Sequence, residues 1–172
     1  MLSMSTRELT LAAVFMAMAF AVRSFNVLVI ETPVPPLKMD VRGIPVFIGS
    51  ILVSPWLAWL IGWAASQFDP IFGWGIDFIG WIPASIVCSL IWRKLEGTRV
   101  SYRVPLSIIG GQALGYSLFT VAFIGFYGVP DAGLYVFLTL LLGRMIGSLI
   151  VASIVGIPIV KFMENQYPDL LR

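Results

Sequence analysis

The sequence contains no histidine, a single cysteine and few charged residues. Without histidine, the chain can form neither a Ser-His-Asp catalytic triad nor a zinc or haem site that uses an imidazole ligand. The lone Cys88 excludes an internal disulfide, a Cys-x-x-Cys redox pair and a cysteine-ligated iron–sulfur cluster within the chain. We therefore expect no metal site and no cofactor, and we expect that the chain is not an enzyme.

Charge is the second scarce property. Only 12% of the 172 residues are charged, about half of the share typical of soluble domains, while 59% are hydrophobic. So few charged side chains could not cover the surface of a soluble protein of this size, whereas a chain surrounded by lipid needs few. The net charge of +2, with no basic run beyond Arg93-Lys94, argues against a nucleic-acid partner. We interpret the chain as an all-α integral membrane protein whose role is binding, transport or service as a subunit.

Apolar stretches separated by polar or proline-containing breaks predict the membrane spans. The predicted spans cover residues 8–24, 42–54, 55–68, 74–92, 105–127 and 134–162. The uncharged segment 43–68 is interrupted by Ser54-Pro55, so it forms either one long kinked helix or two short helices that meet at the proline. The total is accordingly five or six spans.

Polar segments orient these spans. Residues 93–103 carry four positive charges, which predicts a cytoplasmic loop, and the positive-inside rule taken alone favours five spans. Residues 31–40 contain three prolines between charged residues and predict an extended loop outside the hydrocarbon. For the first span a signal peptide is the alternative, because Arg7 precedes the apolar run and Ala19-Phe20-Ala21 has the form of a cleavage site.

Small residues recur at four-residue spacing in three of the predicted spans. They are Ala13, Ala17 and Ala21 in the first, Gly111 and Gly115 in the fifth, and Gly143 and Gly147 in the last. This spacing places small side chains on one helix face, where another helix can approach closely. We expect the glycine pairs to pack inside the bundle, and the alanine face to dock another membrane protein.

Two helix faces carry aromatic and polar residues that suit a binding site. The fourth span aligns Trp74, Asp77 and Trp81, and the fifth aligns Gln112, Tyr116, Thr120, Phe123 and Tyr127. A carboxylate flanked by two indoles and facing this ladder suits a flat organic ligand with polar edges. An interfacial aromatic belt is an equally good interpretation of Trp74 and Tyr127, which lie at span ends.

Arg144 lies about ten residues into the last span, where an unpaired guanidinium is energetically costly. It should therefore face the interior of the bundle. Asp77 and an acidic or carbonyl group of a ligand are equally good candidate partners. Cys88 and the seven methionines are interpreted as packing residues.

Residues 36–68 carry the chain's resemblance to a known family. The stretch contains Leu37-Lys38-Met39-Asp40, then Pro45, and then Ser54-Pro55. It resembles the signature of the substrate-binding S components of energy-coupling factor (ECF) transporters, the membrane systems of vitamin uptake. The alanine face of the first span is similar to the Ala-x-x-x-Ala motif in the first helix of that family.

The resemblance implies a single transmembrane domain over residues 1–172, built as a bundle of six transmembrane helices in the plasma membrane of a prokaryote. It implies cytoplasmic termini, an outer substrate site with the first loop as its lid, and as partners a T component and two cytoplasmic ATPases. It thereby favours six spans over five. The expected substrate-binding residues are Lys38, Asp40, Trp74, Asp77, Trp81, Tyr116, Phe123, Tyr127, Tyr135 and Arg144.

The expected substrate is a water-soluble vitamin. The aromatic residues favour a flat heterocycle, such as riboflavin, a pyridoxine or a pyrimidine, over an acyl-chain ligand such as biotin. The alternative function is a standalone ion-coupled secondary transporter or a small channel, in which Asp77 and Arg144 would form the ion-coupled pair.

Overall fold

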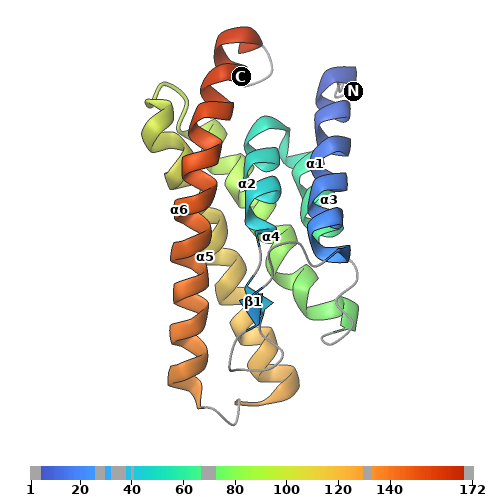
Figure 1. Cartoon of the computed structure of the whole chain (residues 1–172), viewed down its shortest axis with the longest axis vertical. Coiled ribbons are helices and arrows are strands. Elements are labelled where there is room, and N and C mark those ends of the chain that lie inside the picture. Colours follow the sequence, from blue (N-terminus) through green and yellow to red (C-terminus); the bar gives the residue numbers. More distant parts are fainter. Residues whose placement is uncertain are drawn as a thin grey trace.

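The computed structural model describes residues 5–25, 30–31, 38–39, 41–66, 73–129 and 133–168, and within these ranges it is built almost entirely from helices. The helices are α1 (Thr6–Ser24), α2 (Gly43–Leu52), α3 (Pro55–Ser66), α4 (Gly73–Lys94), α5 (Val100–Tyr127) and α6 (Leu134–Gln166). Two short strands, β1 (Ile30–Glu31) and β2 (Lys38–Met39), pair antiparallel between α1 and α2. Both ends of the described chain lie at the same end of the molecule (Figure 1).

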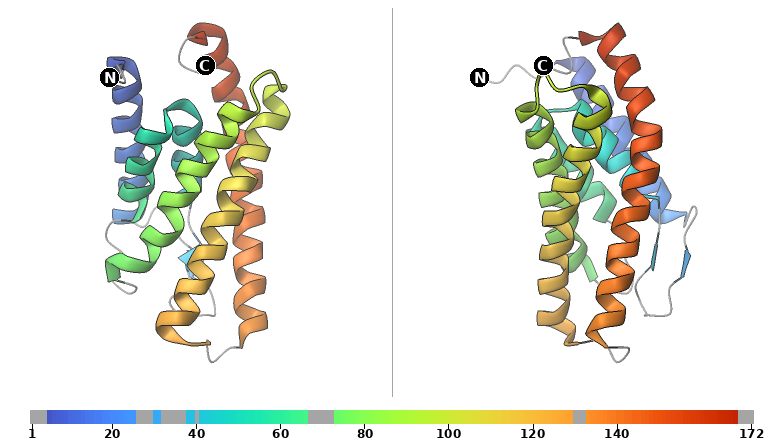
Figure 2. Two further views of the ribbon diagram at one scale, coloured as in Figure 1. Left: turned by 180° about the vertical axis from the view of Figure 1, so that it is seen from behind. Right: turned by 90° about the vertical axis from the view of Figure 1, so that its left-hand side faces the viewer.

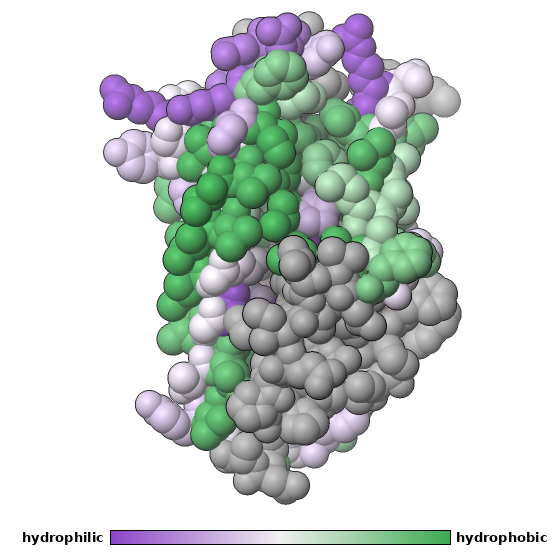
Figure 3. All heavy atoms as spheres, in the orientation of Figure 1, coloured by the Kyte–Doolittle hydropathy of each residue, from purple (hydrophilic) through white to green (hydrophobic). Residues whose placement is uncertain are grey.

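Two of the helices, α5 and α6, are long and apolar enough to cross a membrane. Only 33% of the apolar window of α5 and 22% of that of α6 are buried, so neither resembles the core helix of a soluble protein. Hydrophilic residues gather at the end that carries the termini, and apolar residues cover the side formed by α6 (Figure 3). Length and exposed apolar surface together suggest association with a membrane.

Residues 43–66 form two short helices rather than one long kinked helix. Ser54 accepts the first backbone hydrogen bonds of α3, and Pro55 occupies its first position, where the missing N–H is no loss. The two helices pack against each other. At 1.5 Å per residue they are about 15 and 18 Å long, whereas the hydrocarbon core is about 30 Å thick, so neither crosses it alone.

Helix α1 packs with one face against the helical hairpin formed by α2 and α3, and its other face is exposed. Its Phe15 contributes to the core, and a Cβ added at Gly49 of α2 would lie 2.7 Å from that side chain. The carboxylate of Glu8 accepts a hydrogen bond from the backbone N–H of Ser54 at the hairpin turn. Ala13 and Ala17 lie on the exposed face.

Helices α4 and α5 approach most closely through small residues. A Cβ on Gly111 would lie 2.5 Å from the backbone oxygen of Ala84, and one on Gly115 would lie 2.8 Å from the backbone oxygen of Gly80. Neither position can carry a larger side chain without separating the helices, as expected for internal packing. The prediction of internal packing is wrong for Gly143 and Gly147 of α6, because no atom of the described chain lies near an added Cβ there.

The polar stretch 93–103 is mostly helical, which corrects its prediction as a loop. Only residues 95–99 form the turn, and α5 begins at Val100 rather than at Pro105. Arg103 explains the difference, because its Nε donates a 2.7 Å hydrogen bond to the backbone oxygen of Trp92. Its guanidinium carbon also lies 3.7 Å from the centre of the Trp92 ring. The side chain is thereby partnered although it is buried, and the helix can begin before it.

Helices α5 and α6 extend past α1 to α4 at the end opposite the termini (Figures 1 and 2). There they pack against each other through a second apolar cluster, which comprises Phe119, Phe123, Phe137 and Leu141. The main core lies nearer the termini, among the first five helices and the inner part of α6.

Candidate functional site

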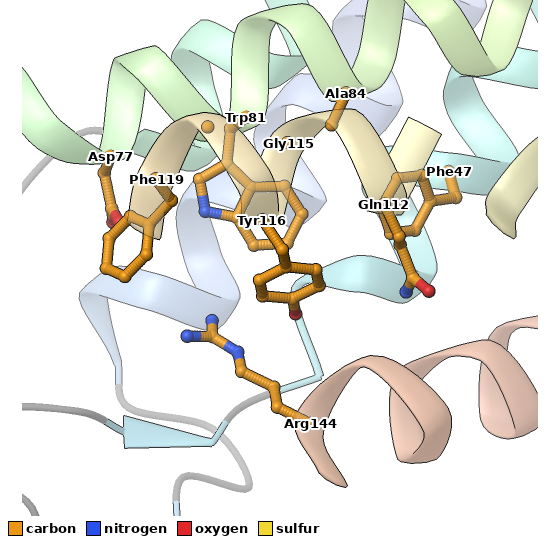
Figure 4. A pocket seen from close by; sticks show the side chains of 10 residues that line it. Phe47, Asp77, Trp81, Ala84, Gln112, Gly115, Tyr116, Phe119 and Arg144 are labelled. Atoms are coloured by element: carbon orange, nitrogen blue, oxygen red, sulfur yellow. The ribbon is translucent and has the colours of Figure 1, made fainter. Parts of the chain in front are cut away.

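A cavity lies where four helices converge near the middle of the molecule. It encloses about 340 Å³ of empty space, including its open mouth. Its lining residues are Phe47 from α2, Asp77, Gly80, Trp81 and Ala84 from α4, Gln112, Gly115, Tyr116 and Phe119 from α5, and Arg144 from α6 (Figure 4).

Small residues bring α4 and α5 into contact beside the cavity. Gly80 and Ala84 are one turn apart on α4, and Gly115 of α5 lies against both. Because these three positions carry no large side chain, the bulkier aromatic groups one turn away form the walls instead. The close contact that holds the two helices together thus also shapes the site.

Aromatic rings form the walls of this cavity. Trp81 is 9% exposed and lies with its ring centre 5.9 Å from that of Phe47. Tyr116 projects from α5 toward α6, and the guanidinium carbon of Arg144 lies 5.9 Å from the centre of its ring (Figure 4). The arrangement offers ring faces for stacking, with a cation at the edge of the space.

Asp77 is ion-paired with Arg42 rather than with Arg144. The Nη1 atom of Arg42 lies 3.0 Å from Oδ2 of Asp77 and donates a second hydrogen bond, at 2.8 Å, to the backbone oxygen of Ala65. The guanidinium carbon of Arg42 also lies 5.3 Å from the centre of the Trp81 ring. Arg42 thus neutralises the carboxylate that faces the cavity and fixes the indole next to it.

Gln112 is the polar residue that lies deepest along this face of α5. The residue is 1% exposed, and neither Oε1 nor Nε2 of its amide has a hydrogen-bond partner in the described part of the chain. Most buried side-chain amides in proteins are hydrogen-bonded, so this one stands out. Its side chain projects from α5 on the same side as that of Tyr116 (Figure 4).

The structure brings together four of the ten predicted substrate-binding residues. The cavity is lined by Asp77 and Trp81 of α4, Tyr116 of α5 and Arg144 of α6. Asp40 and the side chains of Lys38 and Trp74 lie outside the described parts of the structure.

The remaining three predicted residues lie away from the cavity. Phe123 stacks on Phe137 with ring centres 4.7 Å apart, in the second apolar cluster. Tyr127 and Tyr135 are 53% and 83% exposed. They continue the faces of α5 and α6, at the end where these two helices extend past the other described helices (Figure 2).

Six of the ten lining residues were not among the predicted substrate-binding residues: Phe47, Gly80, Ala84, Gln112, Gly115 and Phe119. Phe47 is an ordinary apolar residue of a short helix, so no sequence signal marked it. None marked Arg42 either, which pairs with the cavity residue Asp77. Gln112 did have a signal, because it lies four residues before Tyr116 on one helix face. Among the residues that the structure describes, no cluster of side chains could hold a metal ion.

Comparisons with known proteins do not assign the chain to a family: no family model, no curated protein and no solved structure matches it.

Proposed function

We propose that the chain is the membrane-embedded substrate-binding subunit of an ECF-type importer, and that it binds a water-soluble vitamin with a flat heterocyclic ring, such as riboflavin. The observation that carries the proposal is the cavity, in which Trp81 and Tyr116 supply ring faces beside charged and amide groups. Mostly apolar walls with a few placed polar groups are typical of small-molecule sites. The importer class rests on the resemblance of residues 36–68 to S components.

The proposal includes a bundle of six membrane-embedded helices in the plasma membrane of a prokaryote, with both termini in the cytoplasm; in this bundle α2 and α3 each cross only part of the hydrocarbon core. Arg93, Lys94 and Arg99 border the turn between α4 and α5, which lies at the same end as the termini (Figure 1). Positive charges concentrate on the cytoplasmic side of membrane proteins, which supports this orientation. The cavity would then lie toward the outer half of the membrane.

The partners in this proposal are a T component and two cytoplasmic ATPases. The exposed Ala13 and Ala17 of α1 support it, because small residues let a second helix approach closely within lipid. No Walker sequence occurs in the chain, so ATP hydrolysis would belong to the other subunits.

The Arg42–Asp77 pair favours this proposal over an ion-coupled transporter. That alternative depended on Asp77 and Arg144 forming a coupled pair, and Asp77 is instead bound to Arg42 and to no other described cation. A neutralised carboxylate beside a cavity suits a binding site that orients an organic ligand.

Binding and transport assays test the proposal separately. The purified protein is titrated with riboflavin, thiamine, nicotinamide and biotin while tryptophan fluorescence is recorded, and extracts of the protein are analysed for a co-purified vitamin by mass spectrometry. We expect saturable quenching by a vitamin with a flat ring; failure of all four, with no vitamin in the extract, contradicts the proposal. Vesicle uptake should require the ATPase subunits and ATP, whereas uptake by the chain alone along an ion gradient would favour the secondary transporter.

A further inference from the structure

Gln112 points to a specific chemical feature of the ligand. The residue lines the cavity, is 1% exposed, and has neither amide atom hydrogen-bonded in the described part of the chain. A side-chain amide that is buried without partners opposes folding, so its presence in a wall of this cavity calls for a reason. Packing does not supply one, because a leucine would fill a similar space without the polar atoms.

The chemistry of the amide defines what can satisfy it. Oε1 accepts hydrogen bonds and Nε2 donates them, on adjacent positions of one flat group. The complementary partner is therefore a flat group with a donor and an acceptor on neighbouring atoms, as in a lactam, a ureide, a carboxamide or an aminopyrimidine. Glutamine recognises the edge of adenine in DNA through this same pairing.

Other ligand groups would leave part of the amide unpaired. A carboxylate offers acceptors only and would satisfy Nε2 while it faces Oε1 unfavourably. An ammonium group offers donors only, and an acyl chain offers neither. The amide thus discriminates among ligand classes in a way that the aromatic walls do not.

The surroundings of Gln112 suit a ring whose edge it holds. Tyr116 lies one turn along the same face of α5, and Trp81 forms the wall on α4. A ring stacked on these side chains would place its edge toward the amide. The cavity is open at its mouth, so only part of a ligand would be enclosed between these helices.

We infer that Gln112 is the specificity-determining residue of the site, and that it holds the ligand by a paired donor–acceptor edge of amide or amidine type. The inference rests on the proposed function, since it requires that the cavity binds a small organic molecule. It goes further by naming the group that must be present on that molecule and the side chain that recognises it.

The test combines a nearly isosteric apolar variant with probes that have or lack the edge. Three probes carry the edge: riboflavin, thiamine and nicotinamide. N3-methylriboflavin and 3-acetylpyridine are the edge-blocked counterparts of riboflavin and nicotinamide. Lipoate offers only a carboxylate. Binding is followed by tryptophan fluorescence on the full chain in detergent, for the wild type and for Gln112→Leu. We expect the tightest probe to carry the edge and to bind Gln112→Leu roughly 10- to 100-fold more weakly.

Stability of the ligand-free protein distinguishes recognition from a structural role. Because the amide has no partner in the described part of the chain, Gln112→Leu should unfold at the same temperature as the wild type or at a higher one. A clear fall in its unfolding temperature would assign Gln112 to the fold and overturn the inference. The matched control Ser117→Ala, on the exposed side of α5, should change neither property.

The outcomes separate this inference from the proposed function. If no probe binds the wild type, the proposed function fails, and the inference fails with it. If a probe binds but Gln112→Leu binds it equally well, or if lipoate or an edge-blocked probe binds as tightly as its counterpart, the inference alone is overturned.

Discussion

Arg42 and Asp77 form a buried ion pair, with Nη1 of the arginine 3.0 Å from Oδ2 of the aspartate. Their side chains are only 2% and 8% exposed. Since the same Nη1 also binds the backbone oxygen of Ala65, one guanidinium joins the start of α2, the end of α3 and the first turns of α4. The pair thereby fixes the wall of the cavity on which Trp81 stands.

Removing either partner should destabilise the protein strongly. Arg42→Met or Asp77→Leu leaves the other charge buried, which typically costs about 3–5 kcal/mol, whereas removing both charges relieves most of that penalty. We therefore expect a large fall in the free energy of unfolding for each single variant and partial recovery for the double variant. The measurement is denaturant unfolding in detergent, followed by tryptophan fluorescence. A double variant no more stable than the worse single variant would show that the two charges do not stabilise each other. The control is Arg7→Met, which removes an arginine at an exposed position.

Glu8 should stabilise the contact between α1 and the hairpin of α2 and α3. Its carboxylate accepts a hydrogen bond from the N–H of Ser54, at the N-terminus of α3, where negative charge is also favoured by the helix dipole. Loss of a comparable capping interaction costs about 0.5–2 kcal/mol, so Glu8→Ala should lower stability by that amount. Glu8→Gln keeps an acceptor oxygen and should lie between Glu8→Ala and the wild type. Thermal unfolding of the three proteins checks this order, and equal values for all three would contradict it.

The close contact of α4 and α5 predicts opposite effects for two glycine substitutions. Gly111→Ala places a methyl group 2.5 Å from the backbone oxygen of Ala84, and such overpacking costs about 1–3 kcal/mol. Gly147→Ala meets no described atom, so only the helix propensity of alanine acts, which favours it by about 1 kcal/mol. We expect a lower unfolding temperature for the first variant and an unchanged or higher one for the second. Similar falls in both would mean that the α6 position is packed as tightly as the α5 position.

Local rules of sequence predicted much of this architecture. The uncharged apolar stretches and the Ser54-Pro55 break between two of them are properties of neighbouring residues. They placed the ends of the helices to within a few positions. The start of α5 was missed because it depends on Arg103 stacking on Trp92 from the preceding helix. A contact between helices cannot be read from the charge of one residue.

The candidate site was predictable face by face but not as a whole. Helical periodicity aligned Trp81 with Asp77 and Tyr116 with Gln112, and both faces do border the cavity. Periodicity does not show where along a helix the site ends, however, so it extended the second face to Phe123 and Tyr127. Phe123 instead packs on Phe137 of α6 in the second apolar cluster, and neither residue lines the cavity. The pairing of Asp77 with Arg42 joins residues 35 positions apart and could not be distinguished from a pairing with Arg144.

Trp81 should report ligand binding directly. It lines the cavity and is 9% exposed, whereas Trp56 on α3 is 68% exposed and lies outside the cavity lining. If a flat vitamin stacks on the Trp81 ring, Trp81→Phe should remove most of the ligand-dependent quenching. It should also weaken binding by a few fold, because phenylalanine keeps a smaller ring face. Trp56→Phe is the matched control and should keep both. Unchanged quenching in Trp81→Phe would place the ligand elsewhere.

A large side chain on the alanine face of α1 should block partner docking without affecting the rest of the protein. Ala17 is exposed, so Ala17→Trp should leave the unfolding temperature and vitamin binding unchanged, yet it would prevent the close helix approach that small residues allow. We expect the variant to lose co-purification with the T component and the ATPases, and to lose ATP-dependent uptake in vesicles. Val121→Trp, at a position of α5 that is 72% exposed, adds the same side chain on a different face and should retain both. Loss of assembly in both variants, or in neither, would remove α1 as the docking surface, while loss in Ala17→Trp alone locates the partner on this face.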